Sequence, residues 1–146
     1  MNELSKLIDR NLVNKAEAMM RQMPQIELEV KHHFCKDIYA RELHIPKGVT
    51  LTGKIHKYQQ LNILAKGKIK VLVDNVVKEV EAPFIVVSPP GTKRIAYALE
   101  DCVWLTIHGT DEKDVDAIEK KFIAQNEQDY LEFIEDKQLR LDLKNA

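Results

Sequence analysis

Side chains that could bind an anion or transfer a proton gather in the middle of the chain. Lys54 and His56 stand two residues apart, and Gln60 and Asn62 follow at the same spacing. Alternate residues of a β-strand point to one face of a sheet, so each pair would present its polar groups together. Burying such groups costs free energy unless they form hydrogen bonds or ion pairs, within the protein or with a ligand. The spacing therefore predicts a polar cavity inside a small sheet.

A second polar group follows a turn rich in proline and glycine at residues 88–91. Lys93 and Arg94 come directly after this turn, and Tyr97 lies three residues further on. An ammonium group supplies a point charge, and a guanidinium group can pair with phosphate or carboxylate through two hydrogen bonds. We predict a site for a small anionic molecule, most naturally a nucleotide. The expected ligand-binding residues are Lys54, His56, Gln60, Asn62, Lys93, Arg94 and Tyr97.

Other roles for these residues stay open. Lys93 and Arg94 could be solvated turn residues, with Lys54 paired to an acid such as Glu42. In an enzyme that hydrolyses a phosphoester, or in an isomerase or lyase, His56 would be the general base and Tyr97 or Lys54 the acid. We favour a binder over an enzyme. A structural or assembly protein is the third alternative.

Composition narrows the classes of protein and partner. The 146 residues suit one domain, and 22 basic residues balance 23 acidic ones, so no overall field attracts nucleic acid or an anionic membrane. No apolar run is long enough for a membrane helix, and the start is too polar for a signal peptide. Cys35 and Cys102 lack metal-binding or redox spacing, and reduced thiols in the cytoplasm are expected.

Apolar spacing predicts helices at both ends of a β-rich middle. Leu4, Leu7, Ile8 and Leu12 recur at three- and four-residue steps, a stripe that must pack on the domain or on a second copy. After Thr110 the helical period returns, with a helix expected over 111–128 and a charged, frayed tail after 134. We expect an N-terminal helix at residues 1–24, a β-barrel at 25–109 and a C-terminal helical segment at 110–146, all in one structural domain.

Short strands with turn residues between them fill the middle segment. The first is expected where Ile26, Leu28 and Val30 alternate with charged residues. Seven or more such strands at close spacing indicate an antiparallel sandwich or barrel. For the strand at 38–45 the inner face is undecided, because a one-residue shift inverts it. The two candidate faces are Tyr39, Arg41 and Leu43, or Ala40, Glu42 and His44.

This middle segment resembles the cupin superfamily, whose fold is a double-stranded β-helix, or jelly-roll barrel. The first motif of that family is glycine, five residues, His-x-His, three or four residues, glutamate, six residues and glycine. Here Gly48, Lys54, His56, Gln60 and Gly67 follow at the same spacing. The resemblance implies a mainly β jelly roll with flanking helices. It also implies a metal site, at which this chain keeps only the ligand His56.

The second motif of the family is glycine, five residues, Pro-x-Gly, two residues, histidine, three residues and asparagine. Its proline and central glycine are Pro89 and Gly91, while Arg94 stands where the fourth metal ligand would be. Cations at Lys54 and Arg94 would repel a divalent ion, so we predict no metal and no cofactor. A shifted metal site, on His56 with His44 or His108, is the alternative.

The whole chain also resembles small uncharacterised cupin-like proteins of tailed bacteriophages, in segments such as 61–64 and 88–94. That resemblance implies a viral origin and the host cytoplasm. Together with the predicted anion site, it suggests a binder that sequesters a nucleotide signal of host defence. An enzyme and a virion protein are the alternatives. A homo-oligomer paired through its helices is also expected.

Overall fold

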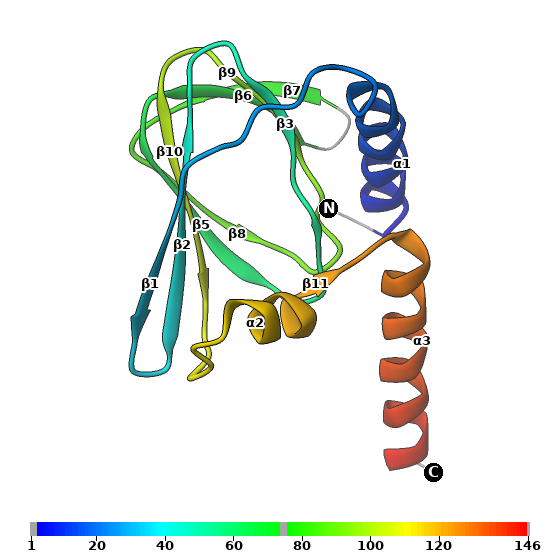
Figure 1. Cartoon of the computed structure of the whole chain (residues 1–146). Helices are drawn as coiled ribbons and strands as arrows, with labels where there is room; N and C mark the ends of the chain where they lie inside the picture. Colours follow the sequence, from blue (N-terminus) through cyan, green and yellow to red (C-terminus); the bar gives the residue numbers. More distant parts are fainter. Residues whose placement is uncertain (1–2, 74–75, 146) are drawn as a thin grey trace.

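Alternating apolar residues build two antiparallel sheets that face each other, in a computed structural model that describes residues 3–73 and 76–145 (Figure 1). The larger sheet has the order β1-β2-β10-β5-β8, with bounds Val30–Cys35, Ile38–Ile45, Cys102–His108, Gln60–Lys66 and Phe84–Ser88. The smaller sheet has the order β3-β9-β6-β7, with bounds Thr50–Thr52, Ile95–Ala98, Lys68–Val73 and Val76–Glu81. A short ribbon pairs β4 (Ile55–His56) with β11 (Ile123–Ala124). The predicted mainly β architecture with helices at both ends is confirmed.

The apolar core lies between the two sheets at the end of the sandwich away from the C-terminal helices. Leu43 and Leu64 of the larger sheet meet Ile69 and Val71 of the smaller one, and all four side chains are buried. Leu64 and Ile69 are almost completely excluded from solvent. Burying side chains of this size stabilises a fold by roughly 2 kcal/mol each relative to exposure. This packing holds the two sheets together and leaves the other end of the sandwich free for a cavity.

The first predicted strand begins later than expected. Residues 26–29 belong to no sheet, and regular pairing with β2 starts at Val30, opposite Leu43. Leu28 and Val30 still pack against the core, whereas Ile26 is exposed. The period-two pattern therefore predicted that Leu28 and Val30 face inward. It did not predict where strand pairing begins, because a β-strand also needs a neighbouring strand.

The C-terminal segment differs most from its prediction. The helix expected over 111–128 is a shorter α2 (Val115–Phe122), followed by β11 and then by α3 (Glu127–Lys144). Ile123 ends α2 because it pairs with His56 of β4. Asn126 then caps the start of α3. Its Oδ1 accepts a hydrogen bond from the Asp129 amide, and the Asp129 carboxylate accepts one from the Gln125 amide. The tail expected to fray after 134 is helical to Lys144.

Helix α1 (Glu3–Met20) places its polar face, rather than its apolar stripe, against the sandwich. Lys6, Asp9 and Arg10 are buried there beside Val13, while Leu4, Ile8, Leu12 and Met19 are 65%, 40%, 46% and 69% exposed. The expected stripe exists, but it does not pack on its own domain. Within the described residues no helix has the length and apolarity needed to cross a membrane.

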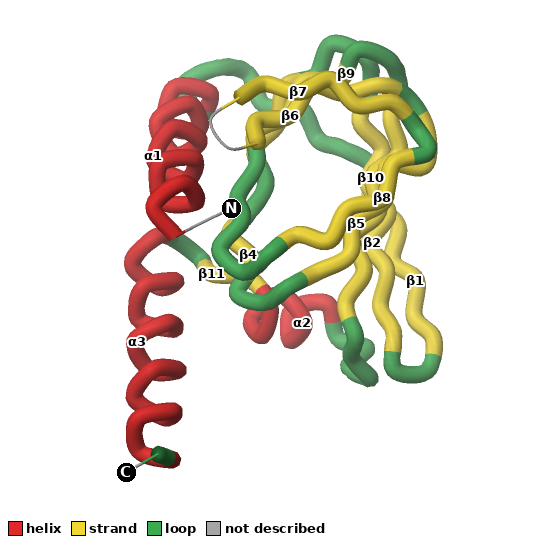
Figure 2. The backbone as a smooth tube through the Cα atoms, turned by 180° about the vertical axis from the view of Figure 1, so that it is seen from behind, coloured by secondary structure: helices red, strands yellow, loops and turns green. Residues whose placement is uncertain are grey.

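Arg10 joins both long helices to the sandwich. Its guanidinium group donates to both oxygens of Glu127 in α3 and to the carbonyl oxygen of Gly91, and it lies 4.9 Å from the centre of the Tyr130 ring. Figures 1 and 2 show α1 and α3 end to end along one side of the molecule. Because this single buried side chain contacts all three parts, it fixes how the helices meet the Pro89–Gly91 turn beside the cavity.

Candidate functional site

A cavity of about 380 Å³ lies between the two sheets. Binding sites for small molecules have volumes of about 300–1,000 Å³, so this cavity is large enough for one. Helix α2 lies across this end of the sandwich (Figure 1) and lines the cavity with Val115, Ile118, Glu119 and Phe122. These positions follow one face of the helix, as residues three and four apart do. The prediction of one helix over 111–128 missed this wall, because a helix boundary set by pairing with a distant strand leaves little local signal.

The walls combine a broad apolar surface with a few polar groups. Leu28, Leu43, Ile45, Ile69 and Val71 line the end of the cavity next to the core. Three aromatic side chains also line the cavity: Tyr39, Trp104 and Phe122. A cavity of this kind suits a ligand with an apolar or aromatic body that is oriented by a small number of polar contacts.

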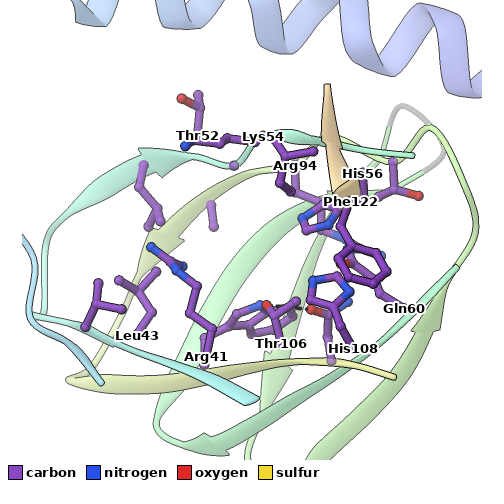
Figure 3. Close-up of a pocket in the computed structure, with 18 of the residues that line it drawn as sticks. Arg41, Leu43, Thr52, Lys54, His56, Gln60, Arg94, Thr106, His108 and Phe122 are labelled. Atoms are coloured by element: carbon purple, nitrogen blue, oxygen red, sulfur yellow. Dashed lines mark hydrogen bonds between the residues drawn. The ribbon is translucent and has the colours of Figure 1, made fainter. Parts of the chain in front are cut away.

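The four positions aligned with the cupin metal motif come together in this cavity. Lys54, His56, Gln60 and Arg94 all line it, and Figure 3 shows Lys54, Arg94 and His56 grouped on one wall. Backbone bonds from two segments bring them together. The amide of Gly91 donates to the carbonyl of His56, and the amide of Gly53 donates to that of Arg94. The motif spacing therefore predicted which residues share the cavity.

Arg94 is held by a chain of buried polar side chains. Its Nη1 donates to the hydroxyl of Ser88 over 2.8 Å, and that hydroxyl also accepts from Asn62 Nδ2 over 2.6 Å. Thr106 in turn donates to Asn62 Oδ1 over 3.1 Å. Burial lowers the pKa of the Arg94 guanidinium, and the negative charge of Asp9 opposes that effect. The network orients one edge of the guanidinium group, and an arginine of this kind stays cationic at neutral pH.

Arg41 is the residue at this site that the sequence left undecided. The structure turns Tyr39, Arg41 and Leu43 of β2 inward, and Glu42 and His44 outward. Among the described residues Arg41 makes no hydrogen bond and no ion pair, although it is half-buried and its guanidinium group reaches into the cavity (Figure 3). The large apolar residues Leu43 and Ile45 on the same face were the available signal for this orientation.

Two histidines line the cavity as neutral rings. Burial, and then the positive charges of His108, Arg94, Arg41 and Lys54, lower the pKa of His56 to about 3. Burial lowers the pKa of His108 to about 4. The His108 ring stacks on Phe122, with ring centroids 4.4 Å apart. The centroid of the His56 ring lies 5.7 Å from that of the His108 ring. Both imidazoles are therefore hydrogen-bonding groups at neutral pH and add no charge.

Two buried polar atoms in the cavity lack a hydrogen-bond partner among the described residues: His56 Nδ1 and Gln60 Oε1. Natural structures pair more than nine in ten buried polar groups, so each exception calls for an explanation. Both atoms belong to residues that line the cavity. A bound molecule would supply the missing partners.

The charge of the lining residues is positive. Arg41, Lys54 and Arg94 face Glu119, which is the one carboxylate among the described lining residues. Lys54 Nζ lies 3.2 Å from Glu119 at the exposed rim, where such a pair stabilises the protein by at most about 1 kcal/mol. The positive charge deeper in the cavity therefore comes from Arg41 and Arg94.

Two of the predicted ligand-binding residues lie outside the cavity. Lys93 reaches α1, where its ammonium group donates to Asn14 over 2.6 Å and to Glu17 over 3.0 Å. Tyr97 lies on β9 with its side chain exposed, because the inward position of that strand belongs to Ala96. The alternative of solvated turn residues is wrong as well, since Lys93 and Arg94 are both bonded within the protein. Lys54 pairs with an acid, but with Glu119 instead of Glu42.

The donor set does not fit the metal that the resemblance to cupins implies. Lys54 and Arg94 are cations, and Gln60 is an amide where the family has a carboxylate. His44 lies on the opposite face of β2 and bonds Glu42, which leaves His56 and His108 as the histidines of the cavity. In residues 3–73 and 76–145, no group of three or more His, Cys, Asp or Glu side chains is placed to hold a metal ion. The structure therefore disfavours the shifted metal site as well.

Comparison with known proteins establishes the fold. No family model and no curated protein sequence matches this chain. The structure of KdgF from Halomonas sp. is similar at 17% identity, over 64% of this chain and 88% of that one, with a TM-score of 0.51. An uncharacterised protein from Klebsiella pneumoniae with a double-stranded β-helix domain is similar at 15% identity, over 63% and 80%, with a TM-score of 0.50. The predicted double-stranded β-helix is thereby confirmed.

Proposed function

We propose that this protein binds a small anionic organic molecule of the nucleotide type in the cavity between its sheets. The observation that carries the proposal is the pair of guanidinium groups, Arg41 and Arg94, in an otherwise mainly apolar cavity. An unpaired half-buried cation is unfavourable in the free protein, and a ligand phosphate or carboxylate would stabilise it. The aromatic walls would contact the base or sugar of such a ligand.

Binding without turnover is the better-supported form of this function. A general acid or base works best with a pKa near the operating pH, and the pKa of His56 is about 3. Of the two acids that an acid–base mechanism could use, Tyr97 lies outside the cavity, and Lys54 pairs with Glu119 at its rim. A phage origin and the capture of a host signalling nucleotide would agree with a ligand that is held and released unchanged, and both remain predictions of the sequence.

The test is isothermal titration with a nucleoside monophosphate, the matching nucleoside and a sugar phosphate. We expect Arg41→Met to weaken nucleotide binding about 10- to 100-fold, because one charge-assisted contact contributes about 1.5–3 kcal/mol. Arg41 is the sharper probe, since Arg94 also bonds Ser88 and its loss would disturb the cavity wall.

The matched control is Arg140→Met, which removes an exposed arginine from α3 and should leave the affinity unchanged. Equal affinity of Arg41→Met and the wild type would contradict the proposal. Tighter binding of the sugar phosphate than of the nucleotide would exclude the nucleotide class. Mass spectrometry of the released ligand reports whether it was altered.

A second copy of the chain is the proposed partner for the outward face of α1. The polar face of that helix is held on the sandwich by Arg10 and by the pairing of Lys93 with Glu17, so the helix cannot turn its apolar stripe inward. We expect a dimer or larger closed oligomer at micromolar concentrations in sedimentation. Ile8→Glu combined with Leu12→Glu should give monomers, whereas Ile85→Glu on the exposed face of β8 should not. A monomeric wild type would rule this partner out.

A further inference from the structure

The side-chain amide of Gln60 is an exception among the buried amides of the cavity wall. Gln60 and Asn62 are alternate residues of β5, both point inward, and they are only 5% and 1% exposed. Asn62 is bonded at both ends, to Thr106 and to Ser88. Gln60 Oε1 has no partner within the part of the chain that the structure describes. The two amides on this strand thus differ in their hydrogen bonding. The fold supplies partners for Asn62 but none for the oxygen of Gln60.

Gln60 Oε1 makes no hydrogen bond even to the residue opposite it. That residue is Ser88 in β8, whose hydroxyl accepts from Asn62 and Arg94. Leaving a buried acceptor unpaired costs about 1–3 kcal/mol. The second atom without a partner, His56 Nδ1, lies in the same cavity. These two atoms mark a polar patch that a ligand could satisfy.

The chemistry of a primary amide limits what this patch can recognise. Gln60 offers one oxygen acceptor and an NH₂ donor in a single plane. The complementary edge has an N–H donor beside an acceptor, as in the amino group and ring nitrogen N7 of adenine. Glutamine pairs with this edge of adenine through two hydrogen bonds in nucleic-acid recognition. Hypoxanthine has a carbonyl oxygen beside N7, so the same edge has two acceptors, and the amide cannot satisfy both in either orientation.

The cavity separates this patch from Arg41. In Figure 3, Gln60, His56, His108 and Phe122 lie together on one side, with Arg94 beside His56, and Arg41 reaches in from the other side. Arg94 belongs with the patch, because it bonds Ser88, the residue opposite Gln60. A ligand with its anionic group at Arg41 would present its other end to Gln60.

We propose that Gln60 makes the cavity selective for adenine nucleotides by pairing with the amino group and N7 of the base. This selectivity rests on the proposed nucleotide binding. His56 supplies a further hydrogen bond to the same base from its Nδ1. Gln60 is thus a specificity-determining residue, and Arg41 supplies affinity that does not depend on the base.

The experiment is isothermal titration of adenosine and inosine monophosphates on the full chain. A well-placed two-bond pair discriminates by about 1–3 kcal/mol, so we expect adenosine monophosphate to bind about 5- to 150-fold more tightly than inosine monophosphate. Gln60→Leu should remove the preference, and it should still fold because it replaces an unpaired buried amide by an apolar side chain. Gln59→Leu, at the exposed neighbouring position, is the matched control and should keep the preference.

The outcomes separate the two proposals. If no nucleotide binds the wild type, both the proposed function and the role of Gln60 are wrong. If adenosine and inosine monophosphates bind equally, nucleotide binding stands and the role of Gln60 is wrong. A preference that persists in Gln60→Leu also overturns that role, whereas its loss in that variant alone supports it.

Discussion

Acidification from about pH 7 to pH 5 is expected to lower the free energy of unfolding by about 4 kcal/mol, through His56 and His108. Both rings have their pKa lowered from the ordinary 6.5, to about 3 and about 4. In this pH window the unfolded chain binds a proton on each ring that the folded protein does not bind. Stability is therefore fully present above pH 6.5 and falls with decreasing pH, by about 2 kcal/mol for each histidine.

Urea unfolding at closely spaced pH values measures this effect. His56→Gln should remove about half of the pH dependence, since one of the two neutral rings is then gone. His33→Gln, on the outer face of β1, controls for the loss of an exposed imidazole. Measurements should stop near pH 5, because the lowered pKa of Glu17 adds its own loss of stability at more acidic pH. A free energy of unfolding that stays constant across the window would show that the rings are not buried as described.

Gly67→Ala is expected to destabilise the fold by about 2–5 kcal/mol. Gly67 joins β5 to β6 with a φ of +92°, and an added Cβ would lie 2.4 Å from the carbonyl oxygen of Asp101 and 2.8 Å from Cys102 Sγ. The positive φ contributes about 1–2 kcal/mol and the overpacking about 1–3 kcal/mol. The backbone carbonyl cannot move away as the end of a flexible side chain could.

Gly48→Ala is the matched control for this substitution. Gly48 also has a positive φ, +85°, but no heavy atom lies within 4 Å of its added Cβ. Only the conformational cost applies there, about 1–2 kcal/mol. Denaturant unfolding of both variants separates strain from overpacking. Equal losses in the two would mean that the contact with Asp101 relaxes without cost.

The cavity also shows how far motif spacing can carry a prediction. Lys54, His56, Gln60 and Arg94 were expected to converge because their spacing matches that of a known barrel, and they do line one cavity. Such spacing works because a strand fixes which residues share a face and a turn fixes where the next strand starts. Tyr97, which is not a motif position and was proposed only for its polar group, lies outside the cavity, and the inward position of its strand belongs to the neighbouring Ala96.

Arg41 illustrates a choice that local pattern could not make. Both faces of β2 contain charged residues, and only the pairing of this strand between β1 and β10 turns Arg41 inward. The partners of the other cations were equally hidden, since Lys93 meets Glu17 from α1 and Lys54 meets Glu119 from α2. These contacts join segments more than sixty residues apart, and a local pattern carries no information on which segments will meet.

The sequence by itself determined the class of fold, the inward character of the motif positions and the replacement of metal ligands by cations. Those properties follow from side-chain chemistry and from periods of two and 3.6 residues, which are local. Only the tertiary structure decided that Arg41 joins the cavity, that α2 lines it and that Gln60 is left without a partner for its oxygen. Each of these depends on which distant segment occupies the adjacent space, and in a sandwich of two sheets that is settled by packing of the whole chain.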